Sequence, residues 1–175
     1  PFRDVVSWSA LISGYSQHGQ DHKALICFEQ MQNEGILPDV VTFSCVLKAY
    51  SHVGDVCGGM IWHAYAIEHG FQIDSYVGNS LVDMYAKFES IPDAERVFAM
   101  LPMRDIITWS ALIAGFAQLG KDSKALFNAF KQMLEEGIEP NSASFSSMLK
   151  MCCHFGLLDK GKLVFEIMIK WYAII

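Results

Sequence analysis

Residues 7–25 read SWSALISGYSQHGQDHKAL, and residues 108–126 read TWSALIAGFAQLGKDSKAL. The two segments are identical at 12 of 19 aligned positions, with a constant offset of 101 residues. Self-similarity at a fixed spacing is the sequence signature of a repeat architecture. This pair of segments therefore predicts that the chain is an array of related structural repeats.

The 101-residue period contains three related repeats, and further repeats follow it. In order, they are Val5–Asp39 (35 residues), Val40–Asp74 (35), Ser75–Asp105 (31), Ile106–Asn141 (36) and the partial repeat 142–175, while residues 1–4 match the end of a preceding short repeat. The fourth repeat is one residue longer than the first. Sequence identity places its extra residue near Asn128 and Ala129, in the second half of the repeat.

Each repeat has the apolar spacing of two helices. Residues at i, i+3, i+4 and i+7 form one face of an α-helix. In the first repeat these are Trp8, Leu11, Ile12 and Tyr15 for one helix and Ala24, Leu25, Phe28 and Met31 for the next. The predicted N-caps of the second helices are Asp21, Asp55, Asp93, Asp122 and Asp159. Two of these helices are predicted to end at glycines that precede a proline by three residues, Gly35 and Gly137.

A single helix pair cannot cover its own apolar faces, so neighbouring pairs must stack. The sequence thus predicts an all-α array in which the first helices form one concave wall, where a ligand would bind. Since neither end of the array has a polar cap, we expect exposed apolar surface over Val5–Tyr15 and along the last helix. Such surface predicts self-association.

The composition is that of a folded protein without a membrane segment. Hydrophobic residues make up 52% of the chain and charged residues 18%. No apolar run reaches the roughly 18 residues that a membrane-spanning helix needs. The net charge of −6 argues against a partner held mainly by counterion release. The five cysteines lack the spacing of a disulfide framework and are expected to be reduced.

Motifs for catalysis and metal binding are missing from the sequence. No histidine is followed two residues later by glutamate, and no Cys-x-x-Cys pair occurs. We therefore expect no zinc ion, no other cofactor and no catalytic residue. His63, beside Trp62, is predicted to be a packed, interhelical side chain. The chain starts at Pro1 without a leader-like segment, so any targeting segment is expected outside it.

The chain resembles the pentatricopeptide repeat (PPR) family over its whole length, because it has repeats of 35, 35 and 31 residues and its first and fourth repeats end in Gly-Ile-x-Pro-Asp and Gly-Ile-x-Pro-Asn. The alternation is similar to the standard, long and short repeats of the plant PLS subclass, which is devoted mostly to organellar RNA editing. VVSWSALI (5–12) and IITWSALI (106–113) resemble the standard type, Gly59-x-x-x-His63-Ala64-Tyr65 the long type, and YVGNSLVDMYAK (76–87) the short type. The resemblance implies a right-handed α-solenoid superhelix of stacked helix-turn-helix repeats that binds single-stranded RNA in a mitochondrion or chloroplast.

The resemblance also implies which residues read the RNA, one base per repeat. The fifth and last residues of each repeat would face the base: Ser9 with Asp39, Ser44 with Asp74, Asn79 with Asp105, Ser110 with Asn141, and Ser146 in the partial repeat. Family usage implies guanine, an unassigned base, uracil and adenine for the four complete pairs, and hence a preference for 5′-GNUA-3′. The second residues, Val6, Val41, Tyr76 and Ile107, would pack against the bases. Phosphates would contact Lys48, Lys87 and Lys150.

Two interpretations of these residues stay open at the level of sequence. A serine near a helix start is often only a cap, and Asp or Asn after proline is often only a turn residue. Four pairs at the same offsets from the apolar faces favour the reading role. The alternative function is a protein-interaction scaffold, which the acidic charge favours. The two functions overlap, because long-type repeats also resemble binding sites for small RNA-editing cofactor proteins.

Overall fold

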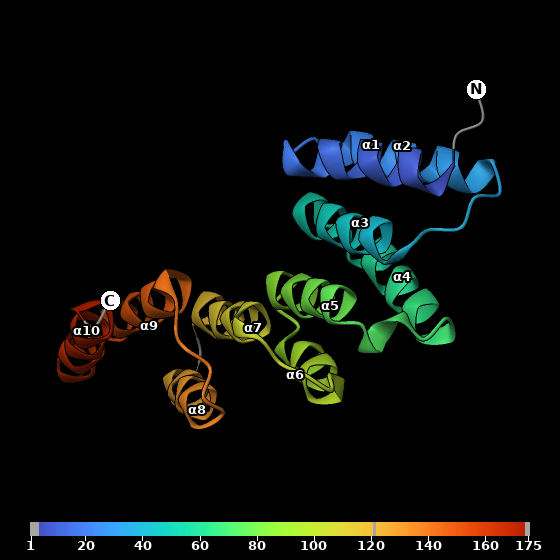
Figure 1. The fold of residues 1–175 in the computed structure, drawn as a ribbon. Coiled ribbons are helices and arrows are strands. Elements are labelled where there is room, and N and C mark those ends of the chain that lie inside the picture. The colour runs from blue at the N-terminus through green and yellow to red at the C-terminus, as the bar shows by residue number, and fades with distance from the viewer. Residues whose placement is uncertain (1–3, 121, 174–175) are drawn as a thin grey trace. The chain divides into compact units, whose positions relative to one another are not determined.

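A computed structural model describes residues 4–120 and 122–173 of the chain, and the regular structure in these residues is entirely helical. The elements are α1 (Val5–Gln17), α2 (Asp21–Asn33), α3 (Val40–Val53), α4 (Val56–Glu68), the short 3-10 helix η1 (Phe71–Ile73), α5 (Ser75–Lys87), α6 (Ile91–Met100), α7 (Ile106–Leu119), α8 (Ser123–Glu135), α9 (Ser142–His154) and α10 (Leu158–Ala173). Figure 1 shows these helices following one another in pairs. The predicted all-α fold is confirmed.

The chain divides into two compact units, Pro1–Met103 and Arg104–Ile175. In the first unit, α1 packs against α2 and α3, and α3 packs against α4 and α5. The first helices of successive pairs, α1, α3 and α5, therefore lie side by side, as Figure 1 also shows. The second helices cover one flank of this layer, with α2 on α1 and α3, and α6 on α5.

The second unit repeats this arrangement with four helices. Here α7 packs against α8 and α9, and α9 packs against α8 and α10. In both units the helix pairs share apolar faces with their neighbours rather than with a central core. This is the packing that a solenoid of short repeats requires.

The core of the first helix pair contains most of the predicted apolar residues. Trp8, Ile12, Ala24, Phe28 and Met31 are at most 1% exposed. Leu11 is 43% exposed and lies within Val5–Tyr15, the segment expected to expose apolar surface. The helices packed on α1 cover the face centred on Trp8 and Ile12, and Leu11 lies beyond its edge.

The predicted caps of the second helices are partly right. Asp55 accepts a hydrogen bond from the Gly58 N–H (2.9 Å), and Asp122 accepts one from the Ala125 N–H (3.0 Å). Asp21 instead follows the N-cap Gln20, and Asp159 is the second residue of α10.

Asp93 was also predicted as a cap but lies in the first turn of α6, whose N-cap is Ser90. Its carboxylate accepts a hydrogen bond from Ser90 Oγ (2.6 Å) and pairs with Arg96 (3.0 Å). An acidic residue in a first turn still stabilises the helix through its dipole, which explains why the same residue type occurs on both sides of the boundary. Gly35 and Gly137 have φ of 72° and 74° after their helices, as predicted.

The extra residue of the fourth repeat lies before α8 and not in the middle of that helix. The N-caps Gln20 and Asp122 differ by 102 positions (122 − 20), one more than the offset of the preceding segments. Buried residues inside the helices keep this larger offset, as with Phe28 and Phe130. The prediction that the extra residue lies near Asn128 was wrong, because residues that are identical in the sequence alignment do not occupy equivalent positions on the two helices.

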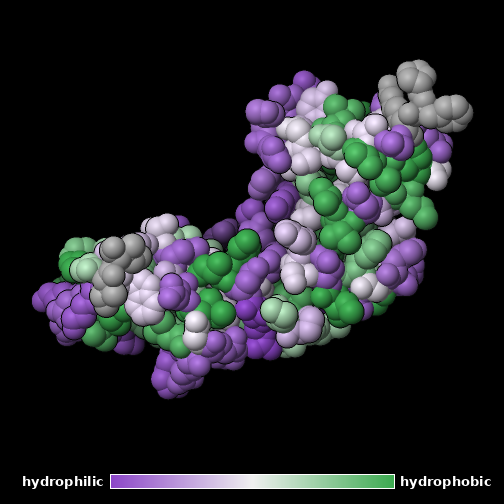
Figure 2. Space-filling model, viewed as in Figure 1, coloured by the Kyte–Doolittle hydropathy of each residue, from purple (hydrophilic) through white to green (hydrophobic). Residues whose placement is uncertain are grey.

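Apolar side chains remain exposed on α1, the first helix of the first unit, and on α10, the last helix of the second unit. On α1, Val6 is exposed in addition to Leu11, and the exposed apolar residues of α10 are Leu158, Leu163, Phe165, Ile169 and Tyr172. Figure 2 shows hydrophobic and hydrophilic surface side by side on each unit. Self-association stays a prediction. Residues 1–3 and 174–175, which belong to the predicted first and last partial repeats, lie outside the described residues. None of the described helices is long and apolar enough to span a membrane.

Candidate nucleic-acid interface

The predicted pair Ser9 and Asp39 lies where α1 meets the start of α3. Asp39 is the N-cap of α3, and its Oδ1 accepts the N–H of Thr42 at 2.8 Å. Ser9 Oγ, which has a single proton to donate, lies 3.1 Å from the same Oδ1, 2.7 Å from the Val5 carbonyl oxygen and 2.6 Å from Thr42 Oγ1. The structure therefore joins the two predicted residues directly and adds Thr42 to them.

The second unit contains the same arrangement between α7 and α9. Ser110 Oγ donates to Asn141 Oδ1 at 3.2 Å and lies 3.1 Å from Ser144 Oγ. Asn141 is the N-cap of α9, and its Oδ1 accepts the Ser144 N–H at 2.9 Å. The fifth residue of one repeat, its last residue and the third residue of the next repeat thus form a polar triad in both units.

Ser44 and Asp74 have the same residue types as the first pair but different contacts. Asp74 N-caps α5, and its Oδ1 accepts the N–H groups of Tyr76 (2.9 Å) and Val77 (3.2 Å). Ser44 Oγ lies 2.7 Å from Ser80 Oγ and 3.5 Å from the Tyr76 carbonyl. At this junction the serine contacts the sixth residue of the next repeat instead of the aspartate.

The third predicted pair is divided between the two units. Asn79 is on α5 in the first unit and is 9% exposed. Asp105 is in the second unit and N-caps α7, where its Oδ1 accepts the backbone N–H and the hydroxyl of Thr108, both at 2.9 Å. Ser146, predicted in the partial repeat, is exposed on α9.

The four residues predicted to pack against bases are large, apolar and exposed. Val6, Val41, Tyr76 and Ile107 are 68%, 54%, 72% and 60% exposed. Each lies three residues before a predicted base-facing residue, and hence on the same side of its helix. Exposed apolar side chains that recur at one repeat position are a feature of interaction surfaces.

The three lysines predicted to contact phosphates differ in their surroundings. Lys48 and Lys150 are exposed, whereas Lys87 Nζ pairs with Asp83 at 2.8 Å. In the second unit, a hollow of about 470 Å³ is lined by Gln118, Lys150 and His154 among others. Among the described residues, no group of three His, Cys, Asp or Glu is placed to hold a metal ion.

His63 links α4 to α5, as predicted for an interhelical side chain. Its Nδ1 lies 2.7 Å from Tyr85 Oη, and the two rings meet edge to face. Burial lowers the pKa of His63 below its usual value of 6.5, although the carboxylate of Asp93 acts in the opposite direction. The neutral form of the imidazole is therefore favoured in the folded chain.

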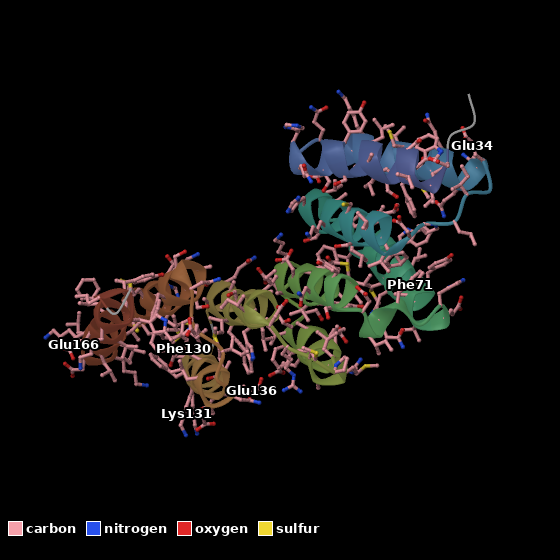
Figure 3. The ribbon with its side chains drawn as sticks, in the orientation of Figure 1. Glu34, Phe71, Phe130, Lys131, Glu136 and Glu166 are labelled. Carbon is pink, nitrogen blue, oxygen red and sulfur yellow. The ribbon has the colours of Figure 1, made fainter. Side chains whose placement is uncertain are left out.

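Four functional or structural residues were missed by sequence reasoning. Thr42 and Ser144 complete the triads, and a hydroxyl recurring at the third position of the repeat was the available signal. Glu34 and Glu136 accept hydrogen bonds from the indole nitrogens of Trp8 (3.2 Å) and Trp109 (3.1 Å). Figure 3 labels both glutamates at the ends of α2 and α8. They anchor α1 to the C-terminal end of α2 and α7 to the C-terminal end of α8.

Stacked helix pairs with a recurring polar triad at the inter-repeat junction define a helical-repeat protein. A sequence profile of the PPR repeat family matches residues 3–52 and 104–154, and a profile of the PPR repeat matches residues 143–171. These matches cover more than half of the chain. The chain belongs to the PPR repeat family.

Similar proteins from Arabidopsis thaliana are much longer than this chain. A putative pentatricopeptide repeat-containing protein is 42% identical over 162 residues, which make up 93% of this chain and 22% of that protein. A mitochondrial pentatricopeptide repeat-containing protein is 36% identical over 172 residues, 97% of this chain and 25% of that protein. The chain thus spans a quarter or less of these curated relatives.

Solved PPR structures share the fold. The pentatricopeptide repeat protein PPR10 in complex with an 18-nt psaJ RNA element has a TM-score of 0.76 at 16% identity, over 97% of this chain and 29% of that one. The PPR domain of Arabidopsis thaliana protein-only RNase P 1 in complex with tRNA has a TM-score of 0.68 at 12% identity, over 92% of this chain and 86% of that one. These likenesses establish the PPR solenoid fold.

Proposed function

We propose that the chain binds single-stranded RNA sequence-selectively, one base per repeat, with a preference for 5′-GNUA-3′. The observation that carries this proposal is the direct contact within Ser9/Asp39 and within Ser110/Asn141, beside the exposed Val6 and Ile107. Helix capping alone requires only the Asp or Asn. It does not require a serine from the previous repeat at hydrogen-bond distance in both units.

The caps determine which atom of Asp39 and of Asn141 is available to a base. In both residues Oδ1 accepts a backbone N–H, so the second atom of the head group is the one available. In Asp39 that atom is Oδ2, an acceptor that suits the ring N–H of guanine. In Asn141 it is Nδ2, a donor that suits the ring nitrogen of adenine. Because the cap occupies Oδ1, whether the last residue of the repeat is Asp or Asn would decide which base is preferred.

The apolar second residues would supply affinity without choosing a base. Val6, Val41, Tyr76 and Ile107 can each cover a base face, and every base has such a face. Tyr76 adds an aromatic ring, which stacks on a base more strongly than an aliphatic side chain. With a net charge of −6, the chain should depend on these contacts more than on a basic surface.

The finer biological role follows from the repeat pattern. The alternation of 35, 35 and 31 residues supports membership of the PLS subclass, and with it a role in specifying sites for organellar C-to-U editing or other transcript processing. Relatives whose names include the word mitochondrial support an organellar location, in a mitochondrion or a chloroplast. The reaction itself would belong to a domain or partner other than these repeats.

An RNA competition experiment tests the proposal. The protein is titrated with an RNA centred on GNUA and with a scrambled RNA of the same composition and length, at one fixed salt concentration. Tighter binding of the GNUA sequence, by about tenfold per lost base contact, is the expected result. Equal binding of the two RNAs would overturn it.

The second candidate is a protein-interaction scaffold. The observation that favours it is the exposed apolar side of α4, which carries Met60, Ile61 and Ile67 at 54%, 65% and 49% exposure. This surface belongs to Val40–Asp74, the repeat that resembles the long type. Long-type repeats of the family resemble binding sites for small RNA-editing cofactor proteins. Equal binding of the two RNAs above, together with loss of a protein partner in Ile61→Glu, would favour the scaffold over RNA recognition.

A further inference from the structure

Two hydroxyl side chains that cannot reach the RNA lie against the proposed reading residues. Thr42 and Ser144 are both 0% exposed, so no ligand touches them directly. Thr42 Oγ1 lies 2.6 Å from Ser9 Oγ, and Ser144 Oγ lies 3.1 Å from both Ser110 Oγ and Asn141 Oδ1. Any effect of these hydroxyls on a base must therefore pass through the serine and the cap residue.

Counting protons at the first junction shows what Thr42 does there. A serine hydroxyl has one proton and two lone pairs. The Val5 carbonyl and the Asp39 carboxylate can only accept, whereas Thr42 has a proton of its own, so the most groups are satisfied when Ser9 donates to one of those two acceptors. The short contact to Thr42 is then a hydrogen bond donated by Thr42 to Ser9 Oγ. One lone pair of Ser9 remains, which leaves the hydroxyl as an acceptor next to Asp39.

The junction at Ser44 shows what happens without this hydroxyl. The third residue of the next repeat is here Val77, whose buried side chain has no hydrogen-bonding group. Ser80 Oγ donates to the Tyr76 carbonyl at 2.9 Å, so its oxygen accepts the proton of Ser44. The serine is thereby directed to Ser80, and the carboxylate of Asp74 caps α5 without it.

We propose that Thr42 and Ser144 are positioning residues, which orient the neighbouring serine and Asp or Asn so that the pair reads one base. This inference rests on the proposed RNA-binding function and adds a third residue to each reading pair. It also assigns the different behaviour of Ser44 and Asp74 to Val77 and Ser80. The third residue of a repeat then decides whether the pair before it discriminates between bases.

Loss of the hydroxyl is tested with Thr42→Val, which keeps the shape of the side chain and the backbone cap. The measured quantity is the ratio of affinities for RNAs with guanine or adenine at the first base. We expect this ratio to fall by about tenfold, the value of one hydrogen bond, while discrimination at the Ser110/Asn141 base is unchanged. Thr42→Ser, the matched control, should retain the wild-type ratio.

Gain of the hydroxyl is tested with the double variant Val77→Thr, Ser80→Ala. It places a threonine beside Ser44 and removes the competing hydroxyl, as at the first junction. A new preference for guanine at the second base, of several-fold, is expected.

The outcomes separate the two proposals. If the wild-type chain discriminates between bases but Thr42→Val lowers all affinities equally, Thr42 is only structural and the positioning role is overturned. No gain in the double variant would overturn the roles of Val77 and Ser80. If the wild-type chain shows no base preference at all, the proposed function fails and the positioning role fails with it.

Discussion

The junctions at Ser9 and Ser44 carry the same two proposed reading residues, serine and aspartate, in different surroundings. Ser9 contacts Asp39 and Thr42, whereas Ser44 contacts Ser80. Both aspartates cap the following helix. The comparison teaches that capping does not depend on the serine, but that joining the two residues depends on the third residue of the next repeat. If the proposed positioning role holds, the identities of the serine and the aspartate alone do not define a base preference.

The largest expected effect concerns the helix packing that the repeats share, and a core substitution on α7 of the second unit tests it. Trp109, which is 1% exposed, should cost about 3–5 kcal/mol of unfolding free energy when changed to alanine. Urea denaturation measures this loss. Val6→Ala, on an exposed position, should change stability by no more than about 0.5 kcal/mol. A loss below about 1 kcal/mol in Trp109→Ala would contradict the proposed core.

Exchange of the cap residue tests whether the two junctions differ in the base that they prefer. Asp39→Asn keeps the helix cap but replaces an acceptor by a donor, so the preferred first base should change from guanine to adenine, with a swing of about tenfold or more in relative affinity. Competition between two labelled RNAs measures the swing. The matched variant is Asp74→Asn, which should leave the second base without a preference. An unchanged preference in Asp39→Asn would refute the assignment of Asp39.

The lysines sharpen the comparison between residues proposed to read bases and residues proposed to contact the RNA phosphates. Lys150→Ala should weaken all RNAs alike and reduce the slope of log affinity against log salt by about 0.7, the value for one phosphate contact with a single strand. Lys87→Ala should have a smaller effect, because its ammonium group already pairs with Asp83. A salt slope that stays the same in Lys150→Ala would remove Lys150 from the interface.

The smallest effect concerns the pH dependence of stability and His63 on α4. Burial lowers the pKa of His63 in the folded chain, so below pH 6.5 the unfolded chain binds more protons than the folded one. Stability contributed by the neutral imidazole is present above that pH and is lost as the pH falls. The difference between the unfolding free energies at pH 7.5 and pH 5.5 should therefore be smaller for His63→Asn than for the wild type. Identical pH dependence in both proteins would contradict this role.

The repeat pattern explains why the fold was predictable from the sequence. Trp8 and Ile12 recur as Trp109 and Ile113 at the same spacing, and all four are buried. Asp55 and Asp122 were predicted as caps from their position after a glycine turn. Local rules of this kind act within a few residues, so a single sequence carries them.

The geometry of the proposed reading pairs was less predictable from the sequence. Whether Ser9 or Ser44 contacts its aspartate depends on Thr42, Val77 and Ser80, which lie more than 30 residues further along the chain. Competition among neighbouring hydroxyls for one proton is a three-dimensional property. The role of Glu34 was missed for a related reason, because its partner Trp8 lies 26 positions earlier and only the folded chain brings them together.

The most direct test of the account is one protein titrated with RNAs that vary at the first base or at the second base. Replacing guanine at the first base should weaken binding by about tenfold, whereas changing the second base should alter affinity by less than about twofold. Equal sensitivity at the two positions would contradict the claim that contact between serine and aspartate, and not their presence alone, reads the base.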